Sequence, residues 1–198
     1  MKETGILFTP ENYDKTASGV KTQTRRVIKP QPILVNDRTW TWPCDGIKSK
    51  ASWAKNLTGK TISLIHAEQC PYGTVGDRLY VKEGLERDEC GARYRRDKQL
   101  VIQKTIGGRY LWQWQRDYLS PLHMPKWAAR LWLELTDVRA ERVREISYDD
   151  EGAEGVTLGP NCNDRHSGFI ALWESINGKG SWDLNPWVWV LSYRRIQS

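Results

Sequence analysis

The strongest strand pattern in the chain lies over residues 129–143 and constrains the fold more than any other segment. Leu131, Leu133 and Leu135 alternate there with polar or aromatic positions, which is the period of a strand that buries one face. A second strand is predicted over 187–193, where apolar residues occupy both faces. A strand of that kind belongs in the centre of a sheet.

Short helices with clear caps are predicted between the strands. Thr9 suits the N-cap of a helix that Gly19 ends, and Ser147 that of a second helix that Gly155 closes. A third helix places apolar residues at i, i+3, i+4 and i+7 over 169–176. Five or six strands with these helices predict one mixed α+β domain over residues 1–198, built around a small β-barrel. Too few helices alternate with strands for a doubly wound parallel sheet.

Two segments without a clean period, 33–60 and 86–118, are predicted to be insertions in this domain. Both interleave basic and aromatic side chains. Basic side chains attract phosphates and aromatic rings stack unpaired bases, so this composition favours a groove for single-stranded nucleic acid. In a second interpretation the tryptophans only attach the insertions to the barrel. The candidate nucleic-acid contacts are Arg93, Arg95, Arg96, Trp112 and Trp114.

Composition agrees with a polyanionic partner, because the formal net charge is +6. No apolar run is long enough to cross a bilayer, and the N-terminus lacks the apolar segment of an export signal, so we expect a cytoplasmic protein with no membrane partner. No C-x-x-C pair occurs, which favours reduced thiols over a zinc site. We therefore expect neither a metal nor a cofactor. Phosphate-binding glycine loops and the usual zinc-protease and serine-hydrolase motifs are absent from the sequence.

The most unusual stretch is Gly19-Val20-Lys21-Thr22-Gln23-Thr24-Arg25-Arg26, at a predicted helix-to-strand junction. Such a polar run either forms a solvated edge or lines a site. Burial next to Arg25 and Arg26 would lower the pKa of Lys21 and permit a chemical role. The alternative is that Lys21 is a solvated turn residue. Thr24 can share a site with Lys21 only if Lys21 lies in the turn, because their side chains would otherwise point to opposite faces of the strand.

Two glutamates stand in unusual positions. Glu83 is predicted on the apolar face of a strand that follows the Gly76-Asp77 turn. Glu154 is predicted at the C-terminal end of the second helix, where the helix dipole disfavours a carboxylate. Each of them either completes a site or forms an ion pair with an arginine.

At these residues the chain resembles ASCH-domain proteins of the PUA-like superfamily, and in particular those of phages and prophages. The resemblance is carried by the 19–26 stretch, by the turn and strand over 75–83, and by the closing strand over 187–193. It covers most of the chain outside the two insertions. It implies a PUA-like β-barrel with flanking helices and a cleft beside the first helix, suited to RNA or a modified nucleoside.

Small ASCH enzymes are amidohydrolases that remove the acetyl group of N4-acetylcytidine with a lysine, a threonine and a glutamate. Lys21 and Thr24 match the first two, and Glu154 is the best match to the third. The resemblance implies that Lys21 activates a water or attacks the acetamide carbonyl. Thr24 would then hydrogen-bond the oxyanion, and Glu154 would pass a proton to the leaving amine. No metal is implied.

The remaining polar residues of these segments are assigned to substrate binding, namely Arg25, Arg26 and Glu83 together with the insertion residues named above. The insertions are superfluous for a free nucleoside and favour a polynucleotide substrate. Three other functions stay open. The chain could be a single-strand ribonuclease, a non-catalytic reader of a modified base or of single-stranded nucleic acid, or a protein whose insertions bind another protein.

Overall fold

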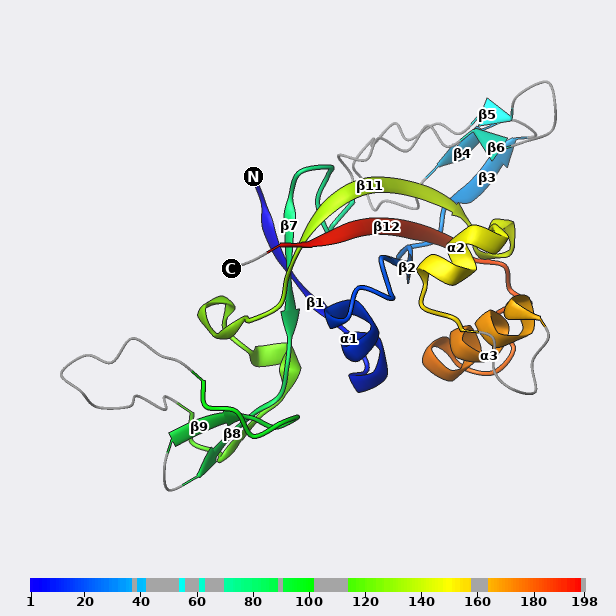
Figure 1. Ribbon diagram of the computed structural model, residues 1–198. Helices are drawn as coiled ribbons and strands as arrows, with labels where there is room; N and C mark the ends of the chain where they lie inside the picture. The colour runs from blue at the N-terminus through cyan, green and yellow to red at the C-terminus, as the bar shows by residue number, and fades with distance from the viewer. Residues whose placement is uncertain are drawn as a thin grey trace.

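The computed structural model describes residues 1–36, 39–41, 54–55, 61–62, 70–88, 91–101, 114–157 and 164–196. At its centre is a five-stranded sheet with the order β1-β7-β11-β12-β2 (Figure 1). Strands β1 and β7 are parallel, and the other neighbours are antiparallel. The five strands are β1 (Glu3–Leu7), β2 (Gln23–Val27), β7 (Arg78–Lys82), β11 (Trp132–Arg142) and β12 (Trp187–Ile196).

Strand β12 is central and buried on both faces, as the sequence predicted. Trp187, Trp189 and Leu191 pack in the main hydrophobic core, whereas Val188 and Val190 belong to a second cluster on the other side. The long predicted strand is β11, which pairs with β12 along its whole length. The pairing of β11 with β12 is the longest in the sheet, and each face of the sheet there is covered by one of the two hydrophobic clusters.

The α-helices of the described residues are α1 (Pro10–Ala17), α2 (Tyr148–Ala153) and α3 (Arg165–Asn177). The first two start at the predicted caps, whereas α3 starts after Asp164, which was not predicted. The Thr9 hydroxyl accepts from Asn12 N at 3.3 Å, and the Ser147 hydroxyl accepts from Asp150 N at 3.2 Å. Gly19 follows α1 with φ of 81°, the left-handed conformation that glycine adopts most readily. The elements η2 (Pro121–His123), η3 (Lys126–Ala128) and η4 (Val143–Glu145) are short 3-10 helices.

The described part of the 86–118 insertion belongs to a second, three-stranded antiparallel sheet with the order β10-β8-β9. Its strands are β8 (Leu85–Asp88), β9 (Gly91–Tyr94) and β10 (Tyr118–Leu119). This sheet has its own hydrophobic cluster and lies beyond β7, away from α2 and α3 (Figure 1). Tyr94 is buried in that cluster and donates its hydroxyl to Ala128 O at 2.7 Å, so its ring is not free to stack a base.

The described part of the 33–60 insertion contains two short strand pairs. Strand β3 (Ile33–Asn36) pairs with β4 (Thr39–Thr41), and β5 (Ala54–Lys55) pairs with β6 (Thr61–Ile62). All four strands are short, and both pairs lie outside the five-stranded sheet. The sheet positions the site described below without them.

The fold is therefore mixed α+β, as predicted, but the main sheet is open. Its edge strands β1 and β2 are not paired with each other. Helix α1 connects these two edges, and Arg26 of β2 donates a side-chain hydrogen bond to the Leu7 carbonyl at the end of β1. Among the described residues, every helix is too short or too polar to span a bilayer.

Candidate functional site

A cavity of about 300 Å³ lies along the edge strand β2 and is lined by residues of both α1 and α3. Because β2 has no neighbour on this side, side chains from both of its faces reach the cavity. The polar lining includes Asn12, Lys21, Thr24, Arg25, Arg26 and Glu154. Five of these six side chains are candidates from the sequence, drawn from two segments far apart in the chain.

Lys21 lies in the turn between α1 and β2, and its backbone N donates to Lys15 O at 2.9 Å. The residue is only 2% exposed, so the alternative of a solvated turn residue is wrong. The Nζ atom donates to the Glu154 carbonyl at 2.8 Å and to the Glu154 carboxylate Oε2. Burial lowers the pKa of Lys21 below its usual 10.5, and Arg26 and Arg25 add to this, whereas the Glu154 carboxylate opposes it.

Glu154 is the C-cap residue of α2, and its carboxylate is held from two sides. Lys21 donates to Oε2, and Arg25 Nη1 donates to Oε1 at 3.1 Å. The unfavourable position at the negative end of a helix is thus offset by two cations. These two contacts fix the orientation of the carboxylate, and both Lys21 and Glu154 line the cavity.

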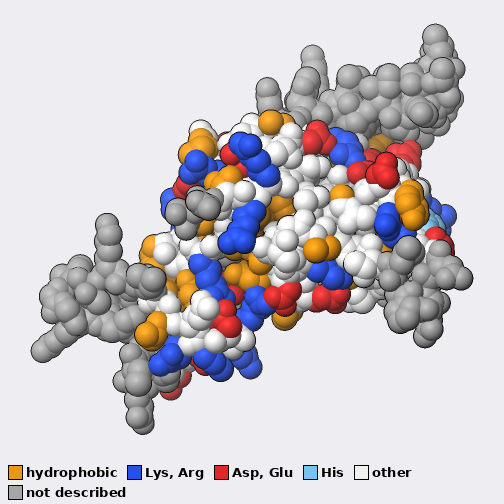
Figure 2. Space-filling view, in the orientation of Figure 1, with side chains coloured by type: hydrophobic (Ala, Val, Ile, Leu, Met, Phe, Trp, Pro, Cys, Tyr) orange, Lys and Arg blue, Asp and Glu red, His pale blue; other side chains and the backbone are white. Residues whose placement is uncertain are grey.

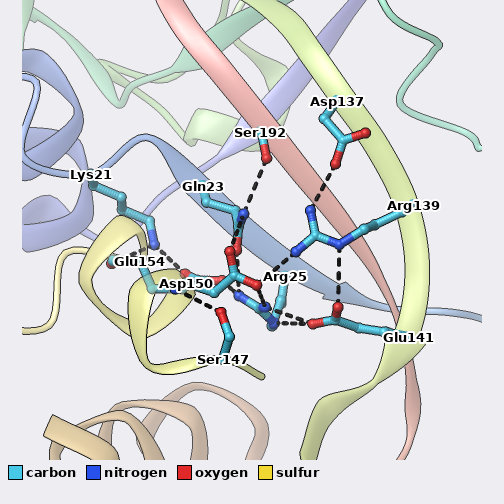
Figure 3. A network of polar contacts seen from close by, with 10 residues as sticks. All are labelled: Lys21, Gln23, Arg25, Asp137, Arg139, Glu141, Ser147, Asp150, Glu154 and Ser192. Carbon is cyan, nitrogen blue, oxygen red and sulfur yellow. Dashed lines mark hydrogen bonds and ion pairs between the residues drawn. The ribbon is translucent and has the colours of Figure 1, made fainter. Parts of the chain in front are cut away.

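Arg25 is the centre of a buried polar network (Figure 3). Its Nε and Nη2 donate to Glu141 Oε1 at 2.9 and 2.6 Å, and Nη2 also lies 3.2 Å from Asp150 Oδ2. Nη1 donates to Gln23 Oε1 at 2.7 Å in addition to Glu154. All three guanidinium nitrogens are therefore occupied by protein acceptors. Arg25 lines the cavity and is held by these acceptors, so the structure gives it a positioning role, and its binding of substrate stays a prediction.

Asp150 connects this network to the first turn of α2. Burial alone would raise the pKa of Asp150, but the hydrogen bond from Gln23 and the charges of Arg139 and Arg25 outweigh it and hold the pKa below 3.8. Arg139 Nη2 donates to the Asp150 carboxylate at 2.7 Å, and Gln23 Nε2 does so at 3.0 Å. These contacts hold α2 against β2 and so fix the position of Glu154.

Thr24 and Arg26 present polar groups that the protein leaves partly unused. Within the described residues, the buried Thr24 hydroxyl has no hydrogen-bond partner. The Arg26 Nε atom is buried without a partner, and no described carboxylate forms an ion pair with this guanidinium. Burial lowers the pKa of Arg26, whose guanidinium lies 5.4 Å from the centroid of the Phe8 ring. The cavity thus retains a hydroxyl and a cation for a ligand.

Opposite these polar groups, the cavity has an apolar wall. Phe169, Leu172, Trp173 and Ile176 of α3 form it. The Phe169 and Trp173 rings lie 6.3 Å apart between centroids and are tilted by 36°. A wall of this kind suits one face or edge of a planar ring.

Comparison with protein-family models, with curated proteins and with solved structures finds no match. The function therefore has to be argued from the residues and geometry of the cavity. Within the described part of the chain, no cluster of three or more histidine, cysteine, aspartate or glutamate side chains could hold a metal ion. Cys70 is a buried free thiol, and the other three cysteines lie outside the described residues.

The structure does not bring Glu83 into this cavity. Its carboxylate accepts from Arg130 Nε and Nη2 at 2.8 and 2.7 Å, which is the ion-pair alternative that the sequence left open. Glu83, Arg95 and Arg96 instead line a second cavity. Arg93 lines neither cavity and donates to Lys98 O at 3.0 Å.

The two candidate tryptophans of the insertion have different outcomes. Trp114 is half-buried and packs against the hydrophobic cluster of the second sheet, as in the interpretation that such residues attach the insertion to the domain. Trp112 lies outside the described residues.

Sequence reasoning missed several contributors to the first cavity. The apolar residues over 169–176 were used only to predict a helix, and Phe8 was not considered as a site residue. Asn12, whose buried Oδ1 has no described partner, was not considered. Asp150 gave a weak signal, since acidic residues in the first turn of a helix are common for reasons of the dipole alone, and Glu141 lies in β11 with no local signal of its own.

Proposed function

We propose that the chain is an ASCH-type protein of the PUA-like class whose β2 cavity hydrolyses the amide of an N-acylated cytosine base. The observation that carries the proposal is the meeting of Lys21, Thr24 and Glu154 in one cavity, with Lys21 Nζ hydrogen-bonded to Glu154. The reference substrate is N4-acetylcytidine, as a nucleoside or within RNA. The approach of β1 and β2 around α1 supports a PUA-like barrel that is incompletely closed.

Lys21 is suited to act as the base in its neutral form. Two of the three non-carbon positions around Nζ point to Glu154 acceptors. The third position carries a proton in the ammonium and the lone pair in the free amine. Because burial and the two arginines lower the pKa of Lys21, the free amine is accessible nearer to neutral pH than in an exposed lysine. A water molecule at this position would lose its proton to Nζ.

The hydroxide so formed adds to the acyl carbon, and the carbonyl oxygen becomes an oxyanion. The Thr24 hydroxyl, free of described partners, supplies a hydrogen bond to that oxygen. The proton on Lys21 passes through the Glu154 carboxylate to the exocyclic nitrogen, and the C–N bond breaks. The products are the free amine of the base and a carboxylic acid, which ionises to a carboxylate by releasing its proton to solvent, so one water is consumed for each amide cleaved.

The size of the cavity supports a single base as ligand. Its volume of about 300 Å³ is at the lower end of ligand pockets, which span roughly 300–1,000 Å³. The rings of α3 provide an apolar face for the pyrimidine. Arg26 provides a cation without an ion-pair partner among the described residues. A dinucleotide would not fit in this cavity alone.

The test is incubation of the purified protein with N4-acetylcytidine, followed by mass spectrometry for cytidine and acetate. We expect wild-type protein to release both in equal amounts. Lys21→Ala and Glu154→Gln should each lower the rate by at least about 100-fold, as expected for loss of an acid–base group. Lys15→Ala is the matched control, because Lys15 pairs with Glu11 at the surface and lines neither cavity.

The same experiment separates this proposal from its alternatives. Shortened RNA fragments in place of deacetylated product would indicate a ribonuclease. Binding of the modified base that persists in Lys21→Ala, with no product from wild-type protein, would indicate a reader. Either result overturns the amidohydrolase.

A further inference from the structure

A second cavity of about 480 Å³ lies on the other side of Phe8, between α1, the end of β7 and the three-stranded sheet. The hydrolysis proposed above makes no use of it. Its lining combines three cations with three aromatic rings: Lys82, Arg95, Arg96, Phe8, Tyr13 and Tyr118.

The acids near this cavity are already paired. The carboxylate of Glu83 accepts hydrogen bonds from Nε and Nη2 of Arg130, and Asp14 forms an ion pair with Arg96. Lys82 Nζ donates to the Leu122 carbonyl, which carries no net charge. No acid among the described residues pairs with Arg95, so the cavity has an excess of positive charge.

The cations are also arranged over rings. The Arg95 guanidinium lies 4.8 Å from the centroid of Tyr118, and that of Arg96 lies 4.3 Å from the centroid of Tyr13. A guanidinium held over a ring offers an outward-facing plane that can stack an unpaired base and donors that can bind a phosphate. Burial and the charge of Glu83 raise the pKa of Tyr13 to about 12, so Tyr13 adds no negative charge near neutral pH.

The two cavities are neighbours, because Phe8 lines both of them. A chain that leaves the first cavity therefore reaches the second by crossing one side chain. Figure 2 shows basic side chains from the middle of this face down to the region of β8 and β9, with hydrophobic side chains among them. Each cavity therefore combines basic with aromatic side chains, and Phe8 belongs to both linings.

We infer that the second cavity binds the nucleotide next to the target base, with its phosphate at Arg95 and its base stacked on the arginine–tyrosine pairs. The substrate is then a single-stranded polynucleotide rather than a free nucleoside. The identity of the target base rests on the proposed function, whereas the binding of the strand does not.

The first test measures binding alone. Fluorescence anisotropy follows labelled eight-residue single strands of RNA and of DNA, with and without one central N4-acetylcytosine, from 50 to 200 mM salt. Arg95→Gln is expected to weaken binding about fivefold or more at low salt and to reduce the salt slope by about 0.7, the value for one phosphate contact on a single strand. Arg194→Gln is the control, since Arg194 is exposed on β12 and pairs with Glu134.

The second test compares substrates. The ratio of kcat/KM for the acetylated RNA strand to that for N4-acetylcytidine should fall about fivefold or more in Arg95→Gln and in Tyr118→Leu. Both residues are exposed, so these substitutions leave the cores untouched.

The two proposals fail separately. If wild-type protein hydrolyses neither substrate, the proposed function is wrong, and anisotropy still decides the second cavity. If Arg95→Gln binds both single strands with the affinity and salt slope of wild-type protein, the second cavity is not a nucleotide site. Equal binding of a polyglutamate peptide, with the same loss in Arg95→Gln, also overturns the assignment, because the cavity would then bind acidic chains in general.

Discussion

Replacing Lys21 by methionine tests the buried ion pair on which the site depends. Methionine keeps an unbranched side chain of similar length but removes the charge and both hydrogen bonds to Glu154. Removing one partner of a buried ion pair costs about 3–5 kcal/mol, because the other charge stays buried. Arg25 still donates to Glu154 Oε1 at 3.1 Å, so we expect the lower end of this range, about 3 kcal/mol.

The assay is equilibrium unfolding in urea, followed by the fluorescence of the eleven tryptophans. A loss of about 3 kcal/mol corresponds to a fall in Tm of roughly 6–12 °C for a chain of this size. Lys15→Met is the matched control. Lys15 forms an i,i+4 pair with Glu11 at 2.6 Å, and such surface pairs contribute only about 0.3–0.5 kcal/mol.

The reasoning is refuted if Lys21→Met loses no more stability than Lys15→Met. A double variant, Lys21→Met with Glu154→Gln, adds a stricter condition. Since the uncompensated carboxylate is then gone, the double variant should be more stable than the sum of the single losses predicts, by about 0.5–3 kcal/mol. Strict additivity would mean that the two side chains do not interact.

Three further outcomes follow from the same structure. The rate of amide hydrolysis should rise with pH through the pKa of Lys21, which lies below 10.5, because the free amine is the reactive form. Since the charge of Arg26 lowers this pKa, Arg26→Gln should move the midpoint of the pH–rate profile to higher pH. An unchanged midpoint would exclude an influence of Arg26 on Lys21. Folding raises the pKa of Tyr13 from 10.0 to about 12, so the neutral phenol stabilises the fold fully below pH 10, and this contribution is lost between pH 10 and about 12. In urea unfolding at about pH 9 and about pH 11, wild-type protein should therefore lose more stability with rising pH than Tyr13→Phe. An equal loss of stability in both proteins would contradict the assignment. Glu83→Gln should lower the free energy of unfolding by about 1–3 kcal/mol, because the neutral amide is a weaker partner for Arg130. If the variant is as stable as wild-type protein in urea, the pair makes no net contribution to stability.

Local rules predicted the elements well because each element carries its own signal. The helix that starts after Thr9, the cap at Ser147 and the two-sided burial of 187–193 depend on residues within one turn or one strand. The closed barrel is different. Whether β1 pairs with β2 depends on the curvature of the whole sheet, which no short pattern encodes, and here the two edges remain unpaired.

The sequence predicted which residues form the site, but not their burial or their hydrogen-bond partners. Lys21 and Thr24 were named, and the condition that Lys21 lies in the turn is met. Its burial could not be read from its neighbours, because its partner Glu154 is the C-cap of α2, 133 residues later. Arg25 was assigned to substrate for the same reason: its acceptors Glu141, Asp150 and Glu154 are distant in sequence.

For the residues of the 86–118 insertion, the sequence predicted a kind of ligand but not the exposure of each side chain. A basic, aromatic composition predicts affinity for nucleic acid but not which side chains remain at the surface. Tyr94 and Trp114 pack in or against the second core, whereas Arg95 and Tyr118 stay exposed beside a cavity. Burial within a small sheet depends on the strand register, which the irregular sequence of this segment does not reveal.

Because the contacts between α2 and β2 join residues far apart in the sequence, the site can form only late in synthesis. Thr22 N donates to Ala153 O at 2.8 Å, Lys21 contacts Glu154 across 133 residues, and β2 pairs with β12. Until β12 is synthesised, β2 has no neighbouring strand, and until the end of α2 is synthesised, Lys21 and Arg25 lack the carboxylate of Glu154. At roughly 5–20 residues per second, that interval lasts several seconds or more on the ribosome. The last quarter of the chain thus supplies both the strand that pairs with β2 and the carboxylate that Lys21 contacts, and a protein truncated before α2 would have neither.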